Sequence, residues 1–376
     1  MDFGFDEVQE DLRGLARTIL TDEVTPGRLK ELEAGTDRVD RRTWEAFAAA
    51  NLLGVCLPEA VGGSGYGIME LCVLLEEVGR RVAPIPLLET VGLAALPIAH
   101  FGTPEQQARL LPTVVAGRSI LTAALQEPGS HDPAQVRTTA TPDGSAWVLT
   151  GEKVAVPWGP LADRILVTAA TGPGAIGLFL IDPGTSGVHI APAESTHRQP
   201  QADLVLDGAR VGAEDVLHSP DTGTGTGTEA VDWLRRHALA CLCATATGVL
   251  DGAVRITAGY LSEREQFGRP LATFQGAALR AADAYIDARA TSVATWSAIW
   301  RLAEGLPADD ALSVAKFWVA DGGQRVAAAC QHLHGGIGVD LDYVIHRYFL
   351  WAKELELTLG GTATHLLRLG AAMAVA

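Results

Sequence analysis

The stretch that decides the interpretation of this chain reads Tyr260-Leu-Ser-Glu-Arg-Glu-Gln-Phe-Gly-Arg-Pro-Leu-Ala-Thr-Phe-Gln275. Apolar positions leading into it recur at helical spacing and predict one long helix, with a face formed by Leu250, Val254, Thr257 and Leu261. Gly268 and Pro270 predict the end of that helix, because glycine tolerates the left-handed conformation and proline cannot continue a helix. Thr273 can then cap a second helix.

Arg264 lies at the corner between these two predicted helices, close to Phe267. The planar guanidinium matches the geometry of phosphate oxygens, so an exposed arginine at such a corner favours a phosphate-binding role. The alternative is an ordinary surface arginine at a helix end, with Phe267 in the core. The stretch by itself leaves both interpretations open.

Composition and charge restrict the class of protein. The chain has 376 residues, of which 48% are hydrophobic, enough for a large core and more than one domain. The net charge of −16 and the lack of a basic cluster argue against nucleic acid or anionic membrane surfaces as partners. The acidic N-terminal segment lacks the apolar run of a signal peptide, and no stretch reaches 18 uninterrupted apolar residues. We therefore expect a cytoplasmic protein without a membrane span.

Side chains that bind metals or form disulfides are scattered along the chain. The ten histidines show no HExxH spacing, and the Cys241-x-Cys243 pair has no second ligand pair nearby, so we expect no metal site. All five cysteines lie in apolar surroundings, which predicts reduced thiols packed as small hydrophobic residues. They are Cys56, Cys72, Cys241, Cys243 and Cys330.

The sequence pattern changes twice along the chain. Residues 1–118 show helical periodicity and contain a capping box at Thr103-Pro-Glu-Gln106. Residues 119–220 consist of short alternating or apolar runs separated by Pro, Gly and Asp, which predicts an antiparallel β domain, a barrel or a sandwich. Residues 221–228 form a Gly/Thr linker, and residues 229–376 are helical again. We therefore predict an α+β fold with an N-terminal helical domain, a middle antiparallel β domain and a C-terminal four-helix-type bundle.

Four local motifs accompany this order of helices, strands and helices. They are PEAVGGSGYG at Pro58–Gly67, LQEPGSHD at Leu125–Asp132, REQFG at Arg264–Gly268 and QHLHGGIG at Gln331–Gly338. The first fails the GxGxxG spacing of a nucleotide loop and is interpreted as a turn. Together the order and the motifs resemble the acyl-CoA dehydrogenase superfamily over nearly the whole chain. The resemblance implies a tetrameric flavoprotein oxidoreductase that removes two hydrogens from the α,β carbons of an acyl-CoA. A carboxylate accepts the α-proton and the flavin accepts the β-hydride.

The resemblance also implies that each FAD lies between two subunits. One subunit supplies the β-domain loops and the catalytic carboxylate, and its neighbour holds the pyrophosphate and adenosine end. The neighbour's half of the pattern is present in this chain, and the resemblance assigns seven residues to FAD binding. They are Arg264, Gln266 and Phe267 on the RxxFG motif, Gln275 eleven residues after the Arg, and Gln331, Gly335 and Gly336 on the adenosine loop.

The β-domain half of the pattern departs from the family. The loop Gln126–Asp132 is one residue shorter than the family's TEPGAGSD, has Gln in place of the Thr and lacks the Gly-Ser pair. In the second flavin loop, after Gly151-Glu-Lys153, Pro157 stands where the family has Thr, which removes a hydroxyl and a backbone donor. Trp158 is a candidate to replace the lost aromatic residue.

The catalytic base is missing from both positions that the family uses. The family's Tyr-Glu-Gly-Thr motif is matched by Leu359-Gly-Gly-Thr362, so Gly360 stands at the position of the carboxylate. The other family position, on the helix before the Arg motif, is Ala238. Relocation of the base to Glu354 or Glu356 is an alternative, but a solvated helix face is the simpler explanation of both residues. No catalytic residue is therefore assigned.

The motifs that hold the far end of FAD are present, and those for the flavin ring and the base are missing. This pattern favours a subunit that completes only the flavin site of its partner. The leading hypothesis is the accessory subunit of a heterotetramer with two copies of each of two subunit types, as in the acyl-CoA dehydrogenases of lipid or steroid degradation. A second acyl-CoA dehydrogenase-like subunit would carry the base, and the complex would meet acyl-CoA and electron-transfer flavoprotein. The alternatives are a self-sufficient flavin oxidase or monooxygenase of the same fold, and a scaffold that binds no flavin.

Overall fold

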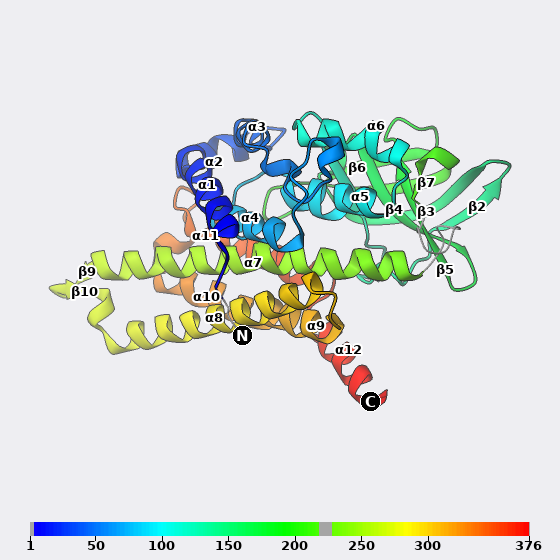
Figure 1. Ribbon diagram of the computed structural model, residues 1–376. Coiled ribbons are helices and arrows are strands. Elements are labelled where there is room, and N and C mark those ends of the chain that lie inside the picture. Colours follow the sequence, from blue (N-terminus) through cyan, green and yellow to red (C-terminus); the bar gives the residue numbers. More distant parts are fainter. Residues whose placement is uncertain (1–3, 218–227, 376) are drawn as a thin grey trace. The chain divides into compact units, whose positions relative to one another are not determined.

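The computed structural model describes residues 4–217 and 228–375. The order of helices, a central sheet and helices again is as predicted (Figure 1). The chain forms two compact units. The helical unit comprises Met1–Gly35, Cys72–Ala83 and Leu239–Ala376, and the β unit comprises Thr36–Leu71 and Pro84–Ala238.

Helices fill the first part of the chain. They are α1 (Glu7–Glu23), α2 (Pro26–Ala34), α3 (Arg41–Ala49), α4 (Ile68–Arg81), α5 (Leu96–Phe101) and α6 (Pro104–Val115), with a π-helical segment at Leu88–Ala95 before α5. The predicted capping box of α6 is confirmed. The Gln106 N–H donates to Thr103 Oγ1 at 3.3 Å, and the Thr103 N–H donates to Gln106 Oε1 at 2.8 Å. These bonds satisfy two of the donors that a helix start leaves unpaired.

One eight-stranded sheet forms the centre of the β unit. Its strands are β1 (Leu121–Ala124), β2 (Thr139–Asp143), β3 (Ala146–Pro157), β4 (Arg164–Gly172), β5 (Ala175–Ile181), β6 (Val188–Glu194), β7 (Pro200–Gly212) and β8 (Val216–Leu217). The order is β6-β7-β3-β2-β4-β5-β8, with β1 paired to β4. The pairing is mainly antiparallel, but β4 pairs in parallel with β1 and with β2. A parallel neighbour needs a long connection, and the β2–β3 hairpin supplies it between β1 and β4.

The last part of the chain is helical. It contains α7 (Thr228–Glu263), α8 (Gln275–Ala303), α9 (Asp309–Phe317), α10 (Gly323–Leu333), α11 (Ile345–Leu357) and α12 (Thr362–Val375), with a π-helical segment at Trp318–Gly322 between α9 and α10. Most of the predicted Gly/Thr linker, residues 221–227, lies outside the described residues, and α7 begins at Thr228. By length and composition Glu229–Glu263 could cross a membrane, yet 78% of its most apolar window is buried. All five cysteines are free and buried, as predicted.

Helices α4 and α7 approach each other at backbone contact distance within the helical unit. A Cβ atom added to Gly79 on α4 would overlap the carbonyl oxygen of Thr245, and one added to Gly248 on α7 would overlap that of Glu76. Gly252, one turn further along α7, faces the carbonyl oxygen of Arg80. The crossing therefore depends on three glycines that place two helix backbones against each other.

Replacing Gly248 by Ala should lower the free energy of unfolding by about 3 kcal/mol or more, because neither backbone can move without disturbing the packed interior. Gly259→Ala is the matched control in the same helix, since no atom lies within 4 Å of its added Cβ. The control should be neutral or stabilising by up to about 1 kcal/mol. Denaturant unfolding followed by circular dichroism measures both, and equal effects would contradict the role of the contact.

Candidate functional site

The stretch around Arg264 forms an exposed β-hairpin between α7 and α8 (Figure 1). Strands β9 (Glu265–Gln266) and β10 (Arg269–Pro270) pair across Phe267 and Gly268, whose φ angles are 54° and 76°. Two consecutive positive φ angles are typical of a type I′ turn, which matches the twist of paired strands. The predicted break between two helices is confirmed, but Gly268 is a turn residue and not a helix cap.

Phe267 occupies the tip of this hairpin with 92% of its surface exposed, so the alternative that placed it in the core is wrong. A bulky residue with positive φ costs about 1–3 kcal/mol and occurs preferentially at functional sites. Behind the tip, the Phe274 ring lies 6.2 Å from the Phe267 ring, and the Arg269 guanidinium lies 4.2 Å over the Phe274 ring. Thr273 does not cap α8, because its hydroxyl donates to the carbonyl of Pro270 at 2.7 Å.

Arg264 begins the hairpin with a free cation. Its backbone N–H donates to the carbonyl of Tyr260 at 2.8 Å, and its carbonyl accepts from the Leu271 N–H at 2.8 Å. The side chain is exposed, and within residues 4–217 and 228–375 its guanidinium has no hydrogen bond or ion pair. Gln266 and Gln275 are exposed as well, and the Gln266 amide donates to the carbonyl of Glu265 at 2.9 Å. The hairpin therefore exposes the Arg264 guanidinium, whose positive charge and N–H donors are available to a ligand.

The second predicted motif forms a turn of 3₁₀ helix, Gly335–Val339, which follows α10 and is called the Gly turn below. Among the described residues beyond the adjacent ones in the chain, no atom lies within 4 Å of a Cβ added to Gly335 or Gly336, and both glycines are exposed. The Gln331 amide donates to the carbonyl of Gly338 at 3.2 Å and so closes this turn from the inside. The open space at the two glycines fits close approach of a ligand to the backbone.

The hairpin and the Gly turn meet through an aromatic contact that the sequence analysis missed. Tyr260 lies one helical turn before Arg264, and its ring stacks on the imidazole of His334 with 4.5 Å between centroids and 29° between planes. The Tyr260 hydroxyl also donates to the carbonyl of His334 at 3.5 Å. The structure therefore places five of the seven predicted residues on the hairpin and the Gly turn, with Gln331 behind the turn on α10 and Gln275 at the start of α8.

In the β unit, a buried ion pair ties the two loops that depart from the family pattern. Lys153 Nζ lies 2.7 Å from Glu127 Oε1 and donates to Thr168 Oγ1 at 3.1 Å. Glu127 also accepts from the backbone N–H groups of Arg137 and Thr138 at 2.6 and 3.1 Å. Burial alone would raise the pKa of Glu127, but the bond and charge of Lys153 hold that pKa below its usual range. Burial lowers the pKa of Lys153, and Glu127 offsets part of the effect.

Trp158 cannot replace the aromatic residue of the second loop. It is fully buried, with φ at 56°, and it packs in a cluster with Val39 and Ile120. The suggested replacement is wrong because the turn after Pro157 directs this side chain into the core of the β unit. Sequence alone gave no signal for this, since Val39 and Ile120 lie far from Trp158 along the chain.

The backbone at the position of the family's base takes a form that favours glycine. Gly360 is buried with φ at 95°, and a Cβ added to it would lie 2.8 Å from Thr364 Cγ2. Below it, the fully buried Lys316 donates to the carbonyls of Glu356 and Gly360 at 2.8 and 2.7 Å. Burial lowers the pKa of this lysine to about 8. Lys316 belongs to no sequence motif, because it reaches this loop through the tertiary fold from a helix, 44 residues before Gly360 in the chain.

The acidic side chains near this loop are engaged elsewhere. Glu356 pairs with Lys353 at 2.5 Å, and Glu354 accepts from the Thr358 hydroxyl at 3.5 Å. Ala238, the second family position, is fully buried and carries no proton acceptor. The geometry therefore gives no support to relocation of the base.

Comparisons with known proteins agree with this arrangement. Family models described as the N-terminal and C-terminal domains of acyl-CoA dehydrogenase match residues 6–118 and 225–374. The chain belongs to the acyl-CoA dehydrogenase family. Acyl-CoA dehydrogenase FadE27 of Mycobacterium tuberculosis is 38% identical over 382 residues, covering 100% of this chain and 99% of the relative.

Two solved structures of acyl-CoA dehydrogenases are similar throughout. The ChsE4–ChsE5 complex from Mycobacterium tuberculosis contains a chain with a TM-score of 0.93 and 38% identity, covering 100% of this chain and 99% of that one. A variant of the Tcur3481–Tcur3483 steroid acyl-CoA dehydrogenase has a TM-score of 0.90 and 47% identity, covering 98% of each chain. The predicted family and fold are confirmed.

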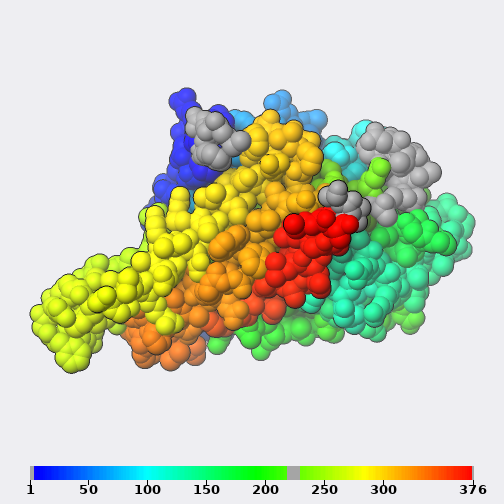
Figure 2. All heavy atoms as spheres, turned by 90° about the horizontal axis from the view of Figure 1, so that it is seen from below, coloured from blue at the N-terminus to red at the C-terminus, as the bar shows by residue number. Residues whose placement is uncertain are grey.

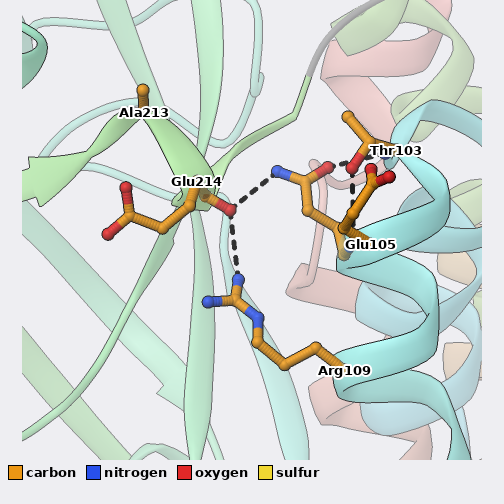
Figure 3. Close-up of a pocket in the computed structure, with 6 residues that line it drawn as sticks. Thr103, Glu105, Arg109, Ala213 and Glu214 are labelled. Atoms are coloured by element: carbon orange, nitrogen blue, oxygen red, sulfur yellow. Dashed lines mark hydrogen bonds between the residues drawn. The ribbon is translucent and has the colours of Figure 1, made fainter.

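A hollow of about 370 Å³ lies between α6 and the end of the sheet in this acyl-CoA dehydrogenase chain (Figure 3). Gln106 and Arg109 both donate to the carbonyl of Glu214, at 2.9 and 3.1 Å, and Arg109 pairs with Asp215 at 2.5 Å. These lining groups bond one another and so connect α6 to the segment after β7, which leaves them satisfied within the protein. The hollow holds none of the predicted flavin residues.

Lys153→Met should lower the free energy of unfolding by about 3–5 kcal/mol, because it leaves the Glu127 carboxylate buried without its cation. Glu152→Gln is the matched control on the neighbouring exposed residue and should change stability by less than about 0.5 kcal/mol. Thermal and denaturant unfolding of the two variants measure the difference, and a loss no larger in Lys153→Met than in the control would refute the role of the pair.

The same pair sets a pH dependence. The pKa of Glu127 is lower in the folded protein than in the unfolded chain. Its contribution to the free energy of unfolding is therefore fully present above the ordinary carboxyl pKa and is lost as the pH falls through the lowered pKa. In Lys153→Met, burial raises the pKa of the lone carboxyl instead, and protonation then relieves the destabilisation. The stability gap between the two proteins should therefore be larger at pH 7 than near pH 4.5, and a constant gap would contradict this account.

Proposed function

We propose that this chain is the accessory subunit of a heteromeric acyl-CoA dehydrogenase and completes the FAD site of a catalytic partner subunit. The complex would carry out α,β-dehydrogenation of a lipid- or steroid-derived acyl-CoA in the cytoplasm, passing electrons to electron-transfer flavoprotein. One observation carries the proposal. Arg264, Gly335 and Gly336, which would hold the far end of the cofactor, are exposed, and the Arg264 guanidinium has no partner among the described residues, whereas the position of the base is a buried glycine.

The exposed half of the site fits FAD. Arg264 can form charge-assisted bonds to a diphosphate, each worth about 1.5–3 kcal/mol. The Gly turn offers backbone without side chains to the adenosine end, and Gln331 supports that turn from inside. When bound, FAD supplies the acceptor for the hydride that leaves the β carbon. This chain's residues hold and orient it.

The other half of the site does not fit a flavin ring that reacts within this chain. Pro157 removes a donor, Trp158 is buried, and Gly360 has neither a carboxylate nor room for one. A general base contributes about 10²–10⁴-fold to rate, so its loss leaves little activity. The partner must then bring the base and most of the contacts to the flavin ring.

The surface beside the hairpin supports a subunit interface. Helix α8 exposes Leu279, Ile286 and Val293 by 57%, 62% and 60%, at helical spacing along one side. Figure 2 shows this helix in yellow on the face seen from below, continuous with the hairpin. An exposed apolar stripe of this kind is typical of a surface that another chain covers. The ChsE4–ChsE5 and Tcur3481–Tcur3483 relatives, each named as two components, also support a second subunit type.

The proposal predicts the flavin content of the purified protein. The chain expressed alone should be colourless, whereas the chain co-expressed with its partner should contain one FAD per two chains, because only one chain of each pair supplies the ring-binding half. Absorbance at 450 nm and protein quantification give the ratio. A yellow, active complex of this chain alone would exclude the accessory role and favour the self-sufficient flavoenzyme.

Arg264→Ala in the complex should weaken FAD binding about ten- to hundredfold, since one or two charge-assisted bonds are lost. Arg118→Ala, another exposed arginine that lies in the β unit, is the matched control and should leave binding unchanged. Titration of the flavin-free complex with FAD measures both dissociation constants. Unchanged binding in Arg264→Ala would favour the scaffold without flavin.

A further inference from the structure

The stack of Tyr260 on His334 joins two segments that lie 74 residues apart in the sequence. Tyr260 is placed on α7 four residues before Arg264, and its carbonyl accepts the Arg264 N–H. His334 directly precedes Gly335, the first residue of the Gly turn. A third ring, Tyr343, lies 6.3 Å from Tyr260 and 5.3 Å from His334 between centroids. The three rings therefore lie next to the first residue of the hairpin and the first residue of the Gly turn.

His334 is held in one orientation. Its ring is 3% exposed, and Nδ1 lies 2.8 Å from the carbonyl of Cys330, so Nδ1 carries the proton and donates. Burial lowers the pKa of His334, which keeps the imidazole neutral near pH 7. Within the described residues Nε2 has no hydrogen-bond partner. A neutral ring held at the C-terminal end of α10 gives Tyr260 a flat surface to pack against.

The functional residues themselves make few contacts that could fix their spacing. The Arg264 guanidinium has no partner in the described part of the chain, and the space around Gly335 and Gly336 is open. The Gln331 amide bonds the far end of the Gly turn, at the carbonyl of Gly338. The ring stack connects the residue one helical turn before Arg264 with the residue directly before the Gly turn.

We propose that Tyr260 and His334 are positioning residues for FAD, and that their stack sets the spacing between Arg264 and the Gly turn. The inference rests on the proposed function. A dinucleotide that engages both segments at once gains affinity only if they are already correctly spaced, because ordering them during binding would oppose it. Neither ring needs to touch the cofactor. Loss of the stack should weaken binding while each segment remains folded.

The test uses the complex of this chain with its catalytic partner, freed of flavin and titrated with FAD. Tyr260→Leu and His334→Ala should each raise the dissociation constant about tenfold, the size expected for loss of one aromatic pair. The double variant should raise it little further, since both changes remove the same contact. Tyr260→Phe and His334→Phe keep a ring and should stay within about twofold of the unchanged protein.

Controls separate this inference from the function it rests on. His332→Ala removes an exposed histidine two residues away and should leave FAD binding unchanged. One contrary result is that Tyr260→Leu and His334→Ala bind FAD as tightly as the unchanged protein and differ only in a lower melting temperature of the flavin-free complex. That result would overturn the positioning role and leave a structural one. If Arg264→Ala also binds normally, the proposed function fails. If only Arg264→Ala weakens binding, the inference alone fails. Should Tyr260→Leu not assemble, His334→Ala carries the same comparison.

Discussion

The backbone contact between α4 and α7 is the constraint on which the helical unit depends. At Gly79 and Gly248 two helices meet without side chains between them, so neither can slide or rotate without losing the contact. Arg264 lies 16 residues beyond Gly248, which corresponds to about 24 Å of helix. A helix of 36 residues anchored in this way acts as a rigid support for whatever its far end carries. The hairpin can therefore be exposed and still be accurately placed.

The two groups of loops described above differ in whether their polar groups are exposed or bonded within the fold. The exposed hairpin and Gly turn offer donors and open backbone, which suit a charged and extended ligand. The loops of the β unit are instead closed on themselves by Glu127 and Lys153, whose charges and bonds are satisfied internally. Lys316 does the same at the loop around Gly360, where a buried ammonium binds carbonyl oxygens. Polar groups in these loops bond one another within the fold, whereas the Arg264 guanidinium on the hairpin has no partner among the described residues.

Sequence reasoning predicted the features whose signals are local. Helical periodicity, the Thr103 capping box and the change to short strands all lie within windows of a few residues, and each is present. The Arg and Gly motifs located the two exposed segments for the same reason. The type I′ turn was missed because Phe-Gly is an unusual pair for it, and propensity favoured a helix end. The parallel pairing of β1 with β4, the burial of Trp158 and the stack on His334 all depend on residues distant in sequence, which no local pattern encodes.

The conformation of Gly360 disfavours a carboxylate side chain at this position. A single base change in a glycine codon can produce glutamate, so the genetic distance is small. The physical distance is larger, because a side chain would require φ to leave 95°, Thr364 to move and the bonds to Lys316 to be remade together. A backbone with positive φ costs a residue other than glycine about 1–3 kcal/mol before it contacts anything. An acid at this site would therefore require several coordinated substitutions, so under the proposed function this chain would not gain a base of its own by a single change.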